Sequence, residues 1–356
     1  MNPVRNSSGA LKPHGRALHR MAYEAEQRGI IFNGVNRGRA RMVCAAVWLA
    51  VASVAGSPWS AIAEVQYHAV LPVATDAGIH QSYTAHRAYF DPAAARRNQL
   101  LVFLPGTAGR NDGSPRAFSK TAAELGYHVI DLSYPNSTSA TICWRQSDPA
   151  CFENFRREII EGRDFSPLIS VDRADSIENR LEKLLQMLNG REPETRWGQF
   201  LDSTGRLTWE KVALAGQSQG GGHAALIARD HSVARVLLFG APKDYNPNLR
   251  KPAPWYRPGS TPVERFFAFV HTRDRQGCEF TQQLDIYRAM GMGGEARSVD
   301  GAAPPYGNAH ILLTSYPGRP ISSLEAHVIG ISNQVRDASG VPFFKPVWTY
   351  MLTAGE

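Results

Sequence analysis

A serine in a glycine-rich turn is the residue of this chain best suited to act as a nucleophile. Ser218 lies in the string Gly216-Gln-Ser-Gln-Gly220, which follows an apolar run and precedes a run rich in Ala, Leu and Ile. A nucleophilic serine needs such a strand-to-helix turn, because small flanking residues let it close sharply and point backbone N–H groups toward a developing oxyanion. Glycine-rich turns also serve close packing of a helix on a sheet, so the string alone is weak evidence. The strand before it and the helix after it predict a nucleophile at Ser218.

A second turn of this kind lies well upstream. Pro105-Gly106-Thr107 follows the apolar run Leu100–Leu104, which has the continuous hydrophobicity of a buried parallel strand. Together with the serine turn, this arrangement resembles the α/β-hydrolase superfamily over most of the chain, from about Val65 to Leu352. In that superfamily a strand ending in His-Gly or a similar pair carries one oxyanion donor, and proline stands here in place of the histidine.

The resemblance implies an oxyanion hole and a subgroup of the superfamily. The hole would consist of the backbone N–H groups of Thr107 and Gln219, with Ala108 as an alternative to Thr107. Ser218–His223 (Ser-Gln-Gly-Gly-Gly-His) and Pro346–Tyr350 (Pro-Val-Trp-Thr-Tyr) are similar to motifs of secreted bacterial members whose substrates are unassigned. This similarity favours an exported enzyme and does not indicate a substrate.

Two aspartates are candidates for the acid of a Ser-His-Asp triad. In the α/β-hydrolase order the acid follows the serine and precedes the histidine. Asp274 comes just after the apolar run Phe266–His271, the second strand beyond the serine turn and the usual position in the superfamily. Asp244 follows the preceding strand, which is a rarer placement. We expect Asp274 to orient the imidazole, with Asp244 as the alternative, and the other aspartate to be a loop or capping residue.

His327 is the predicted base among three candidate histidines. It lies in a predicted loop beyond the last strand, His310–Thr314, at the sheet edge where Ser218 also emerges. His310 begins that strand and therefore lies at the opposite edge, so a structural role is expected. His223 follows Ser218 by about one helical turn, too close in sequence to approach the hydroxyl from the required side. We expect His223 to line the pocket or to pack beneath the turn.

These residues predict an exported serine hydrolase that cleaves a carboxylic ester through an acyl-enzyme. Ser218 would attack the carbonyl carbon, His327 would accept and return the proton, and Asp274 would hold the imidazole tautomer. A lipase or a peptidase would use the same triad, and a non-catalytic binding protein could retain the fold. The expected partner is a small-molecule or lipid-like ester. Cys and His nowhere have zinc-like spacing, so we expect no metal, and we expect no cofactor.

Apolar strands alternating with amphipathic helices must position these residues. Strands are predicted at 65–71, 83–90, 100–104, 127–132, 209–215, 234–239, 266–271 and 310–314, and helices at 114–125, 175–188, 219–229, 280–290 and 344–352. This alternation predicts an α/β fold with a mostly parallel central sheet and helices on both faces, as one α/β-hydrolase domain over 64–356. The polar, aromatic and cysteine-bearing segment at about 133–171 is interpreted as a lid-like insertion over the sheet.

The first 63 residues have the features of an export signal. Three arginines between positions 37 and 41 precede the apolar run Met42–Ala55, and Ala61-Ile-Ala63 forms a small-x-small cleavage site. This order is typical of a secretory signal peptide. We expect residues 1–63 to be removed and the body to be periplasmic or extracellular, without stable membrane insertion. An uncleaved anchor helix is the alternative.

The net charge of +7 does not indicate nucleic-acid binding. Residues 1–63 hold eight of the 39 Lys and Arg but only two of the 32 Asp and Glu, so the body retains 31 basic and 30 acidic residues. A nearly neutral body has no broad positive surface for a phosphate backbone. We therefore expect no nucleic acid among its partners.

Cysteine usage fits an oxidising compartment. Without Cys44 of the leader, the cysteines that remain are Cys143, Cys151 and Cys278. Cys143 and Cys151 bracket a short loop, and a disulfide closing it would stabilise the fold by about 2–3 kcal/mol. We predict this disulfide, with three free buried thiols as the alternative. Cys278 is left over in either case.

Overall fold

The computed structural model describes residues 64–81, 84–109 and 116–355. The chain divides into the units Met1–Trp59 and Ser60–Glu356, and every described residue belongs to the second unit. The predicted signal peptide lies outside the described residues. The same holds for residues 114 and 115, with which the first predicted helix was expected to begin.

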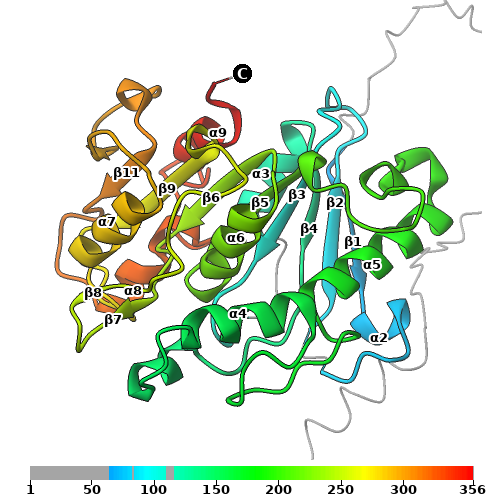
Figure 1. Ribbon diagram of the computed structural model, residues 1–356. Helices are drawn as coiled ribbons and strands as arrows, with labels where there is room; N and C mark the ends of the chain where they lie inside the picture. The colour runs from blue at the N-terminus through cyan, green and yellow to red at the C-terminus, as the bar shows by residue number, and fades with distance from the viewer. Residues whose placement is uncertain (1–63, 82–83, 110–115, 356) are drawn as a thin grey trace, which may run out of the picture. The chain divides into compact units, whose positions relative to one another are not determined.

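Nine strands of the described residues form one mixed sheet (Figure 1). In spatial order they are β1 (Gln66–Val70), β2 (His86–Phe90), β4 (His128–Asp131), β3 (Leu100–Leu104), β5 (Val212–Gln217), β6 (Arg235–Phe239), β9 (Phe266–His271), β11 (Ile311–Thr314) and β10 (Arg297–Ser298). β2 runs antiparallel to β1 and β4, and the other neighbouring pairs are parallel. The predicted α/β architecture with a mostly parallel sheet is confirmed.

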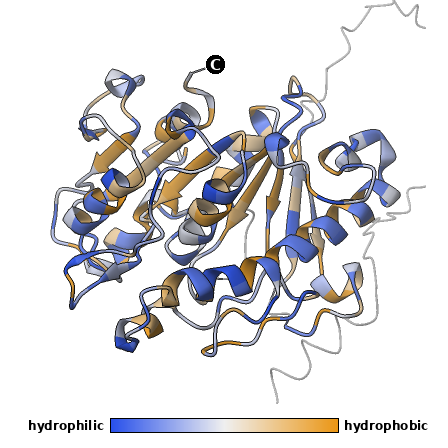
Figure 2. Cartoon of the chain, in the orientation of Figure 1, coloured by the Kyte–Doolittle hydropathy of each residue, from blue (hydrophilic) through white to orange (hydrophobic). Residues whose placement is uncertain are grey.

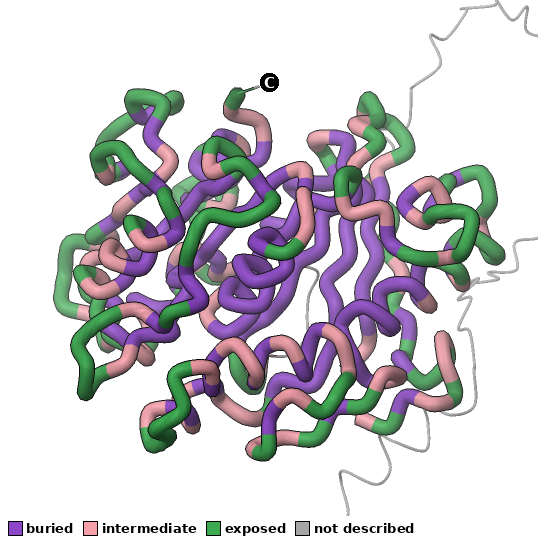
Figure 3. Tube along the Cα trace, in the orientation of Figure 1, coloured by how far each residue is buried: buried purple, intermediate pink, exposed green. Residues whose placement is uncertain are grey.

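The central strands are apolar on both faces because both faces are covered. All residues of β3, β6 and β9 are buried, and the strands stand out as hydrophobic in Figure 2 and as buried in Figure 3. Along β3, Leu100, Val102 and Leu104 belong to one core, whereas Leu101 and Phe103 belong to the other. This alternation follows from the two-residue period of a strand and explains the continuous apolar runs of the sequence.

Helices form one layer on each face of the sheet (Figure 1). One layer contains α4 (Cys151–Glu161), α5 (Ile177–Arg191), α6 (Gln219–Asp230) and α7 (Phe280–Ala289), and the other contains α3 (Ala117–Glu124) and α9 (Lys345–Thr353). In α5, Leu181, Leu184, Leu185 and Leu188 recur at helical spacing and are buried, as the sequence indicated. The Ser176 hydroxyl caps this helix by accepting a hydrogen bond from the N–H of Asn179 at 3.2 Å.

The segment at 133–171 contains a helix that the sequence analysis did not predict. Within it, α4 buries Phe155 and Ile159 and packs against α5 and α6. Its charged residues made the segment look like a polar insertion, yet Phe152, Phe155, Ile159 and Ile160 follow helical spacing. α4 therefore belongs to the layer of helices on the sheet. Also not predicted are the short elements α2 (Pro72–Thr75), β7 (Tyr245–Asn246), β8 (Lys251–Pro252), β10 and α8 (Ser323–Val328).

The direction of the chain across the sheet reverses between β3 and β5. From β3 the chain passes through α3 to β4 on one side, whereas β5 lies on the other side of β3. In open α/β sheets a crevice forms where the chain direction reverses in this way. Ligands of open α/β sheets bind in such crevices. The loops after β3, β5, β6 and β9 all emerge at this edge, since these strands are parallel.

Candidate active site

The turn at Ser218 is strained and depends on its glycines. Ser218 directly follows β5, caps α6 and has φ 54° and ψ −119°, a conformation that side-chain-bearing residues rarely adopt. A Cβ on Gly216 would lie 2.4 Å from a backbone carbon of Gly220, and a Cβ on Gly220 would lie 2.0 Å from the Leu104 carbonyl oxygen. Glycine at both positions thus lets the turn close tightly against β3.

The loop after β3 lies against this turn. A Cβ on Gly106 would lie 3.0 Å from the Cβ of Ser218. Asn136 holds the loop, because its Nδ2 donates to two loop carbonyl oxygens at 2.7 and 2.9 Å. The Asn136 carbonyl also accepts a hydrogen bond from the N–H of Ala108 at 2.9 Å. Ala108 is therefore engaged, which favours Thr107 over Ala108 as a donor near Ser218.

The Gln219 side chain ties the loop after β3 to the segment around residue 140. Its Oε1 accepts from the Thr107 hydroxyl at 3.0 Å and from the Ala140 N–H at 2.9 Å. Its Nε2 donates to the Thr138 carbonyl at 3.0 Å. Among the described residues, neither the Thr107 nor the Gln219 backbone N–H has a hydrogen-bond partner. Both residues line one pocket.

His327 lies on the short helix α8, so the predicted loop at this position was wrong. The hydroxyl of Ser322 accepts from the N–H of Glu325 at 3.0 Å and begins the helix. A Ser-x-x-Glu string is a known sequence signal for a helix start, and the sequence analysis gave it no weight. The helix buries most of the His327 side chain and places it at the edge of the pocket.

The structure brings Asp274 and His327 together. The Nδ1 atom of His327 lies 2.9 Å from Oδ2 of Asp274, and both side chains are buried. Gly240, with φ 53°, leaves room for this contact, because a Cβ there would lie 3.1 Å from Asp274 Oδ2 and 3.2 Å from His327 Nδ1. A neutral imidazole that donates from Nδ1 presents Nε2 as a proton acceptor.

Asp274 is held as a carboxylate by several donors. Besides His327, its Oδ2 accepts from Lys243 Nζ at 2.8 Å and from Gln283 Nε2 at 3.4 Å. Its Oδ1 accepts from the Gln276 N–H at 3.0 Å. Burial acts to raise the pKa of Asp274, but the hydrogen bond from His327 and the charge of Lys243 outweigh burial and hold this pKa below its ordinary value.

The rival aspartate, Asp244, is engaged elsewhere. Arg156 contacts it through two hydrogen bonds, Nε to Oδ2 at 2.6 Å and Nη2 to Oδ1 at 2.5 Å. The indole N–H of Trp255 also donates to Asp244 Oδ2 at 3.0 Å. Only 1% of either charged side chain is exposed. The structure therefore places Asp274, and not Asp244, against His327.

The other two histidines lie away from the pocket. His310 Nδ1 is hydrogen-bonded to the carbonyl of Phe266 at 2.8 Å, in keeping with a structural role. His223 is fully buried, and its ring contacts Tyr134 edge-on at a centroid distance of 5.4 Å. Burial lowers the pKa of His223 well below its ordinary value, so this ring is a neutral packing group beneath the turn.

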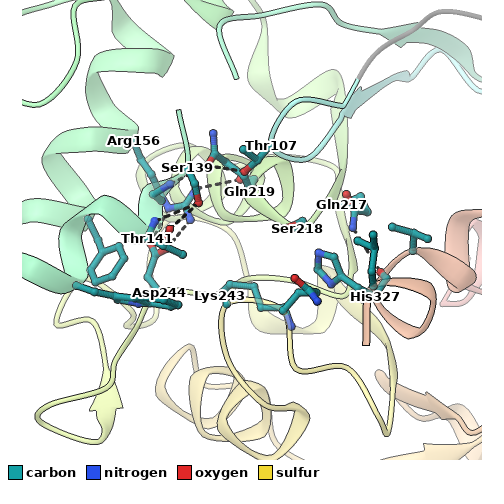
Figure 4. Close-up of a pocket in the computed structure, with 17 residues that line it drawn as sticks. Thr107, Ser139, Thr141, Arg156, Gln217, Ser218, Gln219, Lys243, Asp244 and His327 are labelled. Carbon is teal, nitrogen blue, oxygen red and sulfur yellow. Dashed lines mark hydrogen bonds and ion pairs between the residues drawn. The ribbon is translucent and has the colours of Figure 1, made fainter. Parts of the chain in front are cut away.

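A pocket of about 400 Å³ opens beside Ser218 (Figure 4). Its lining residues are Thr107, Ser139, Ala140, Thr141, Trp144, Phe152, Arg156, Gln217, Ser218, Gln219, Lys243, Asp244, Gln276, Gly277, Leu324, His327 and Val328. Ser218 lies between Thr107 and Gln219 on one side and His327 on the other. Within the described residues no hydrogen bond joins Ser218 to His327, and such bonds often tighten only when substrate is bound.

The predicted disulfide is confirmed and lies next to the pocket. Cys143 and Cys151 are joined with a Cα–Cα distance of 5.7 Å. They connect α4 to the 3₁₀ helix Ala140–Arg145, which contributes Thr141 and Trp144 to the pocket wall. Cys278 is free and buried, and burial raises its pKa to about 12, so its thiol is protonated at neutral pH.

The sequence analysis did not predict several residues of this site, among them Lys243, Arg156 and Asn136. Lys243 and Arg156 each pair with one of the candidate aspartates, and Asn136 holds the loop after β3. Lys243 follows β6 and Asn136 follows β4, so both lie near the carboxyl edge of the sheet. This position in the sequence could have marked them as candidate site residues. Arg156 lies on a helix that the sequence analysis missed, and no spacing rule connects it with Asp244.

Comparisons with protein families and with curated proteins do not assign this chain to a family. No protein-family model matches the chain, and no curated protein matches it either. In the part of the chain that the structure describes, no group of three or more His, Cys, Asp or Glu side chains is placed to hold a metal ion. No helix in this part of the chain has the length and hydrophobicity to span a membrane.

Proposed function

We propose that this protein is a serine hydrolase of the α/β-hydrolase fold that cleaves a carboxylic ester. The observation that carries the proposal is the meeting of four separate segments at one edge of the sheet. They contribute a strained Ser218, the N–H groups of Thr107 and Gln219, and the hydrogen-bonded pair of Asp274 and His327. These are the nucleophile, oxyanion donors, acid and base that acyl transfer requires.

In the proposed reaction, Ser218 Oγ attacks the ester carbonyl carbon while Nε2 of His327 takes its proton. The Thr107 and Gln219 N–H groups stabilise the negative oxygen of the tetrahedral intermediate. His327 then returns the proton to the departing alcohol, which leaves an acyl-enzyme on Ser218. A water molecule, deprotonated by His327, releases the acid and restores the serine.

Strain at Ser218 favours catalysis over a non-catalytic binding role. A non-glycine residue held at such backbone angles costs of order 1–3 kcal/mol, and such strain clusters at functional sites. A protein that kept the fold only to bind would gain nothing from strain at a serine facing a histidine–aspartate pair. No feature of the described residues therefore favours a non-catalytic binding protein over an enzyme.

The pocket favours a compact ester over a long-chain lipid. Its volume is about 400 Å³, and polar residues such as Thr141 and Gln276 share its lining with apolar ones such as Trp144 and Leu324. A pocket of this volume with a mixed lining suits a compact ester. The segment from Ala140 to Phe152, which forms one wall, is the part that we propose acts as a cover. The disulfide supports export, because disulfides persist in oxidising compartments.

The proposal is tested by hydrolysis of p-nitrophenyl esters from acetate to laurate, with matched peptide anilides for amide cleavage. Ser218→Ala and His327→Gln should each lower kcat by at least about 10³-fold. Ser203→Ala, on an exposed loop, is the control and should retain full activity. Turnover of anilides in place of esters would support the peptidase alternative. Full activity in Ser218→Ala would contradict the proposal.

A further inference from the structure

The acid of the proposed triad carries a second cationic partner. Lys243 Nζ lies 2.8 Å from Asp274 Oδ2, the same oxygen that lies 2.9 Å from His327 Nδ1. One carboxylate oxygen thus serves a lysine and an imidazole at once. The two nitrogens lie within about 6 Å of each other, as their distances to the shared oxygen require.

Lys243 is fixed in this position by the loop that follows β6. Its neighbour Asp244 is anchored by Arg156 and by the Tyr256 hydroxyl, which accepts from the Asp244 N–H at 3.1 Å. Upstream, the Tyr287 hydroxyl donates to the Ala241 carbonyl at 2.7 Å. The ammonium group also donates to the Cys278 carbonyl at 3.2 Å, and 8% of its side chain is exposed. These contacts hold the Lys243 ammonium group against the buried carboxylate of Asp274.

We propose that Lys243 is a positioning residue that shares the Asp274 carboxylate with His327 and thereby weakens the support that this carboxylate gives to a positive charge on the imidazole. The inference rests on the proposed function only for its kinetic consequence. If Asp274 contacted His327 alone, its whole negative charge would be available to stabilise a positive charge on the imidazole. A cation within about 6 Å opposes a positive charge on that imidazole.

Other titratable or charged groups around the pair do not supply this effect. The groups around Asp274, on its own loop or on neighbouring elements, are His271, Arg273, Arg275, Cys278, Glu279, Tyr287 and Asp244, and Glu325 lies two residues before His327 on α8. Burial keeps Cys278 and Tyr287 protonated and lowers the pKa of His271, so these three are neutral near pH 7. Asp244 is neutralised by Arg156 and Glu325 by Arg319. Arg273, Arg275 and Glu279 are exposed, where solvent screens their charges.

The test is the substitution Lys243→Met, which keeps the length of the side chain and removes its charge. Gln283→Met is the matched control, because it removes a neutral donor from the same oxygen. Two readouts are taken: the pH dependence of kcat/KM, and titration of the His327 ring by NMR in ¹³C,¹⁵N-histidine-labelled protein. Lys243→Met should move both midpoints upward by about one to two pH units, whereas Gln283→Met should move them by a few tenths.

Equal midpoints in wild type and Lys243→Met, or equal shifts in both variants, would overturn the inference. Lys243→Gln repeats the test if the methionine variant does not fold, and Lys243→Arg should restore the wild-type midpoint. The NMR titration needs no turnover. A shift in NMR without ester hydrolysis by wild type would therefore reject the proposed function while supporting the shared carboxylate.

Discussion

Substitution of the two buried aspartates, one at a time, separates a stability role from a catalytic one. Asp244→Asn removes the charge that faces Arg156, and Asp274→Asn removes the charge that faces His327 and Lys243. Both side chains are buried, so sequence position and burial alone predict the same outcome for both. Their partners predict different outcomes.

The magnitudes follow from what each partner can do once the carboxylate is gone. An arginine does not give up its proton, so Asp244→Asn leaves a buried, uncompensated charge and should lower the free energy of unfolding by about 3–5 kcal/mol. A buried lysine can deprotonate, so Asp274→Asn should destabilise less. Without the carboxylate the imidazole loses its orientation and its charge partner, and kcat should fall by about 10³–10⁴-fold.

Both quantities are measured on the same purified samples. Urea unfolding followed by tryptophan fluorescence gives the free energy of unfolding, and ester hydrolysis at a temperature where each variant is folded gives kcat. Folded Asp244→Asn should keep kcat within about 10-fold of wild type, because the contact of Asp274 with His327 is intact. A large loss of kcat in Asp244→Asn at unchanged stability, with Asp274→Asn still active, would refute this assignment of roles.

Three further changes test other parts of the structure. Gly220→Ala should lower stability by about 1–3 kcal/mol and kcat by about 10²-fold, because the new methyl group would overlap the Leu104 carbonyl oxygen of β3. Gly190→Ala, in open space on α5, should instead stabilise by about 0.5–1 kcal/mol in the same unfolding assay. Cys143→Ser should lower the free energy of unfolding by about 2–3 kcal/mol, since the disulfide closes a loop with a sequence separation of 8; unfolding with and without reductant checks this. The pKa of Asp274 is lower in the folded protein than in the unfolded chain, so its contribution is present above about pH 4 and is lost as pH falls through the folded value. Urea unfolding between pH 5 and pH 2 should therefore show a larger loss in wild type than in Asp274→Asn, because carboxylates such as Asp76 and Glu153, whose pKa values are also lowered, titrate in both proteins.

The sequence predicted the strands and the turns because these signals are local. Continuous apolar runs such as Leu100–Leu104 and Phe266–His271 match β3 and β9 without a shift in their bounds. The glycines around Ser218 indicated a turn that closes against a strand, and the structure shows which atoms require this. The disulfide also followed from a short spacing within one segment.

What the sequence did not predict depends on contacts between distant segments. Arg156 and Asp244 are separated by 88 positions, and no local pattern pairs them. Chain order favoured Asp274 over Asp244, but the contact with His327 that distinguishes the two aspartates spans 53 positions and has no local pattern. α4 and α8 were missed for a different reason, because charged residues masked the helical spacing of the first and the capping pattern of the second was overlooked.

Covalent labelling of Ser218 tests most directly whether this serine is an activated nucleophile. A fluorophosphonate probe reacts with a serine hydroxyl only when a neighbouring base and oxyanion donors activate it. Purified protein is treated with the probe, and intact mass and peptide mapping locate the adduct. One adduct per chain is expected, on the peptide that contains Ser218, and none in Ser218→Ala or after denaturation. A folded wild-type protein that takes up no probe, or takes it up on another residue, would contradict this expectation.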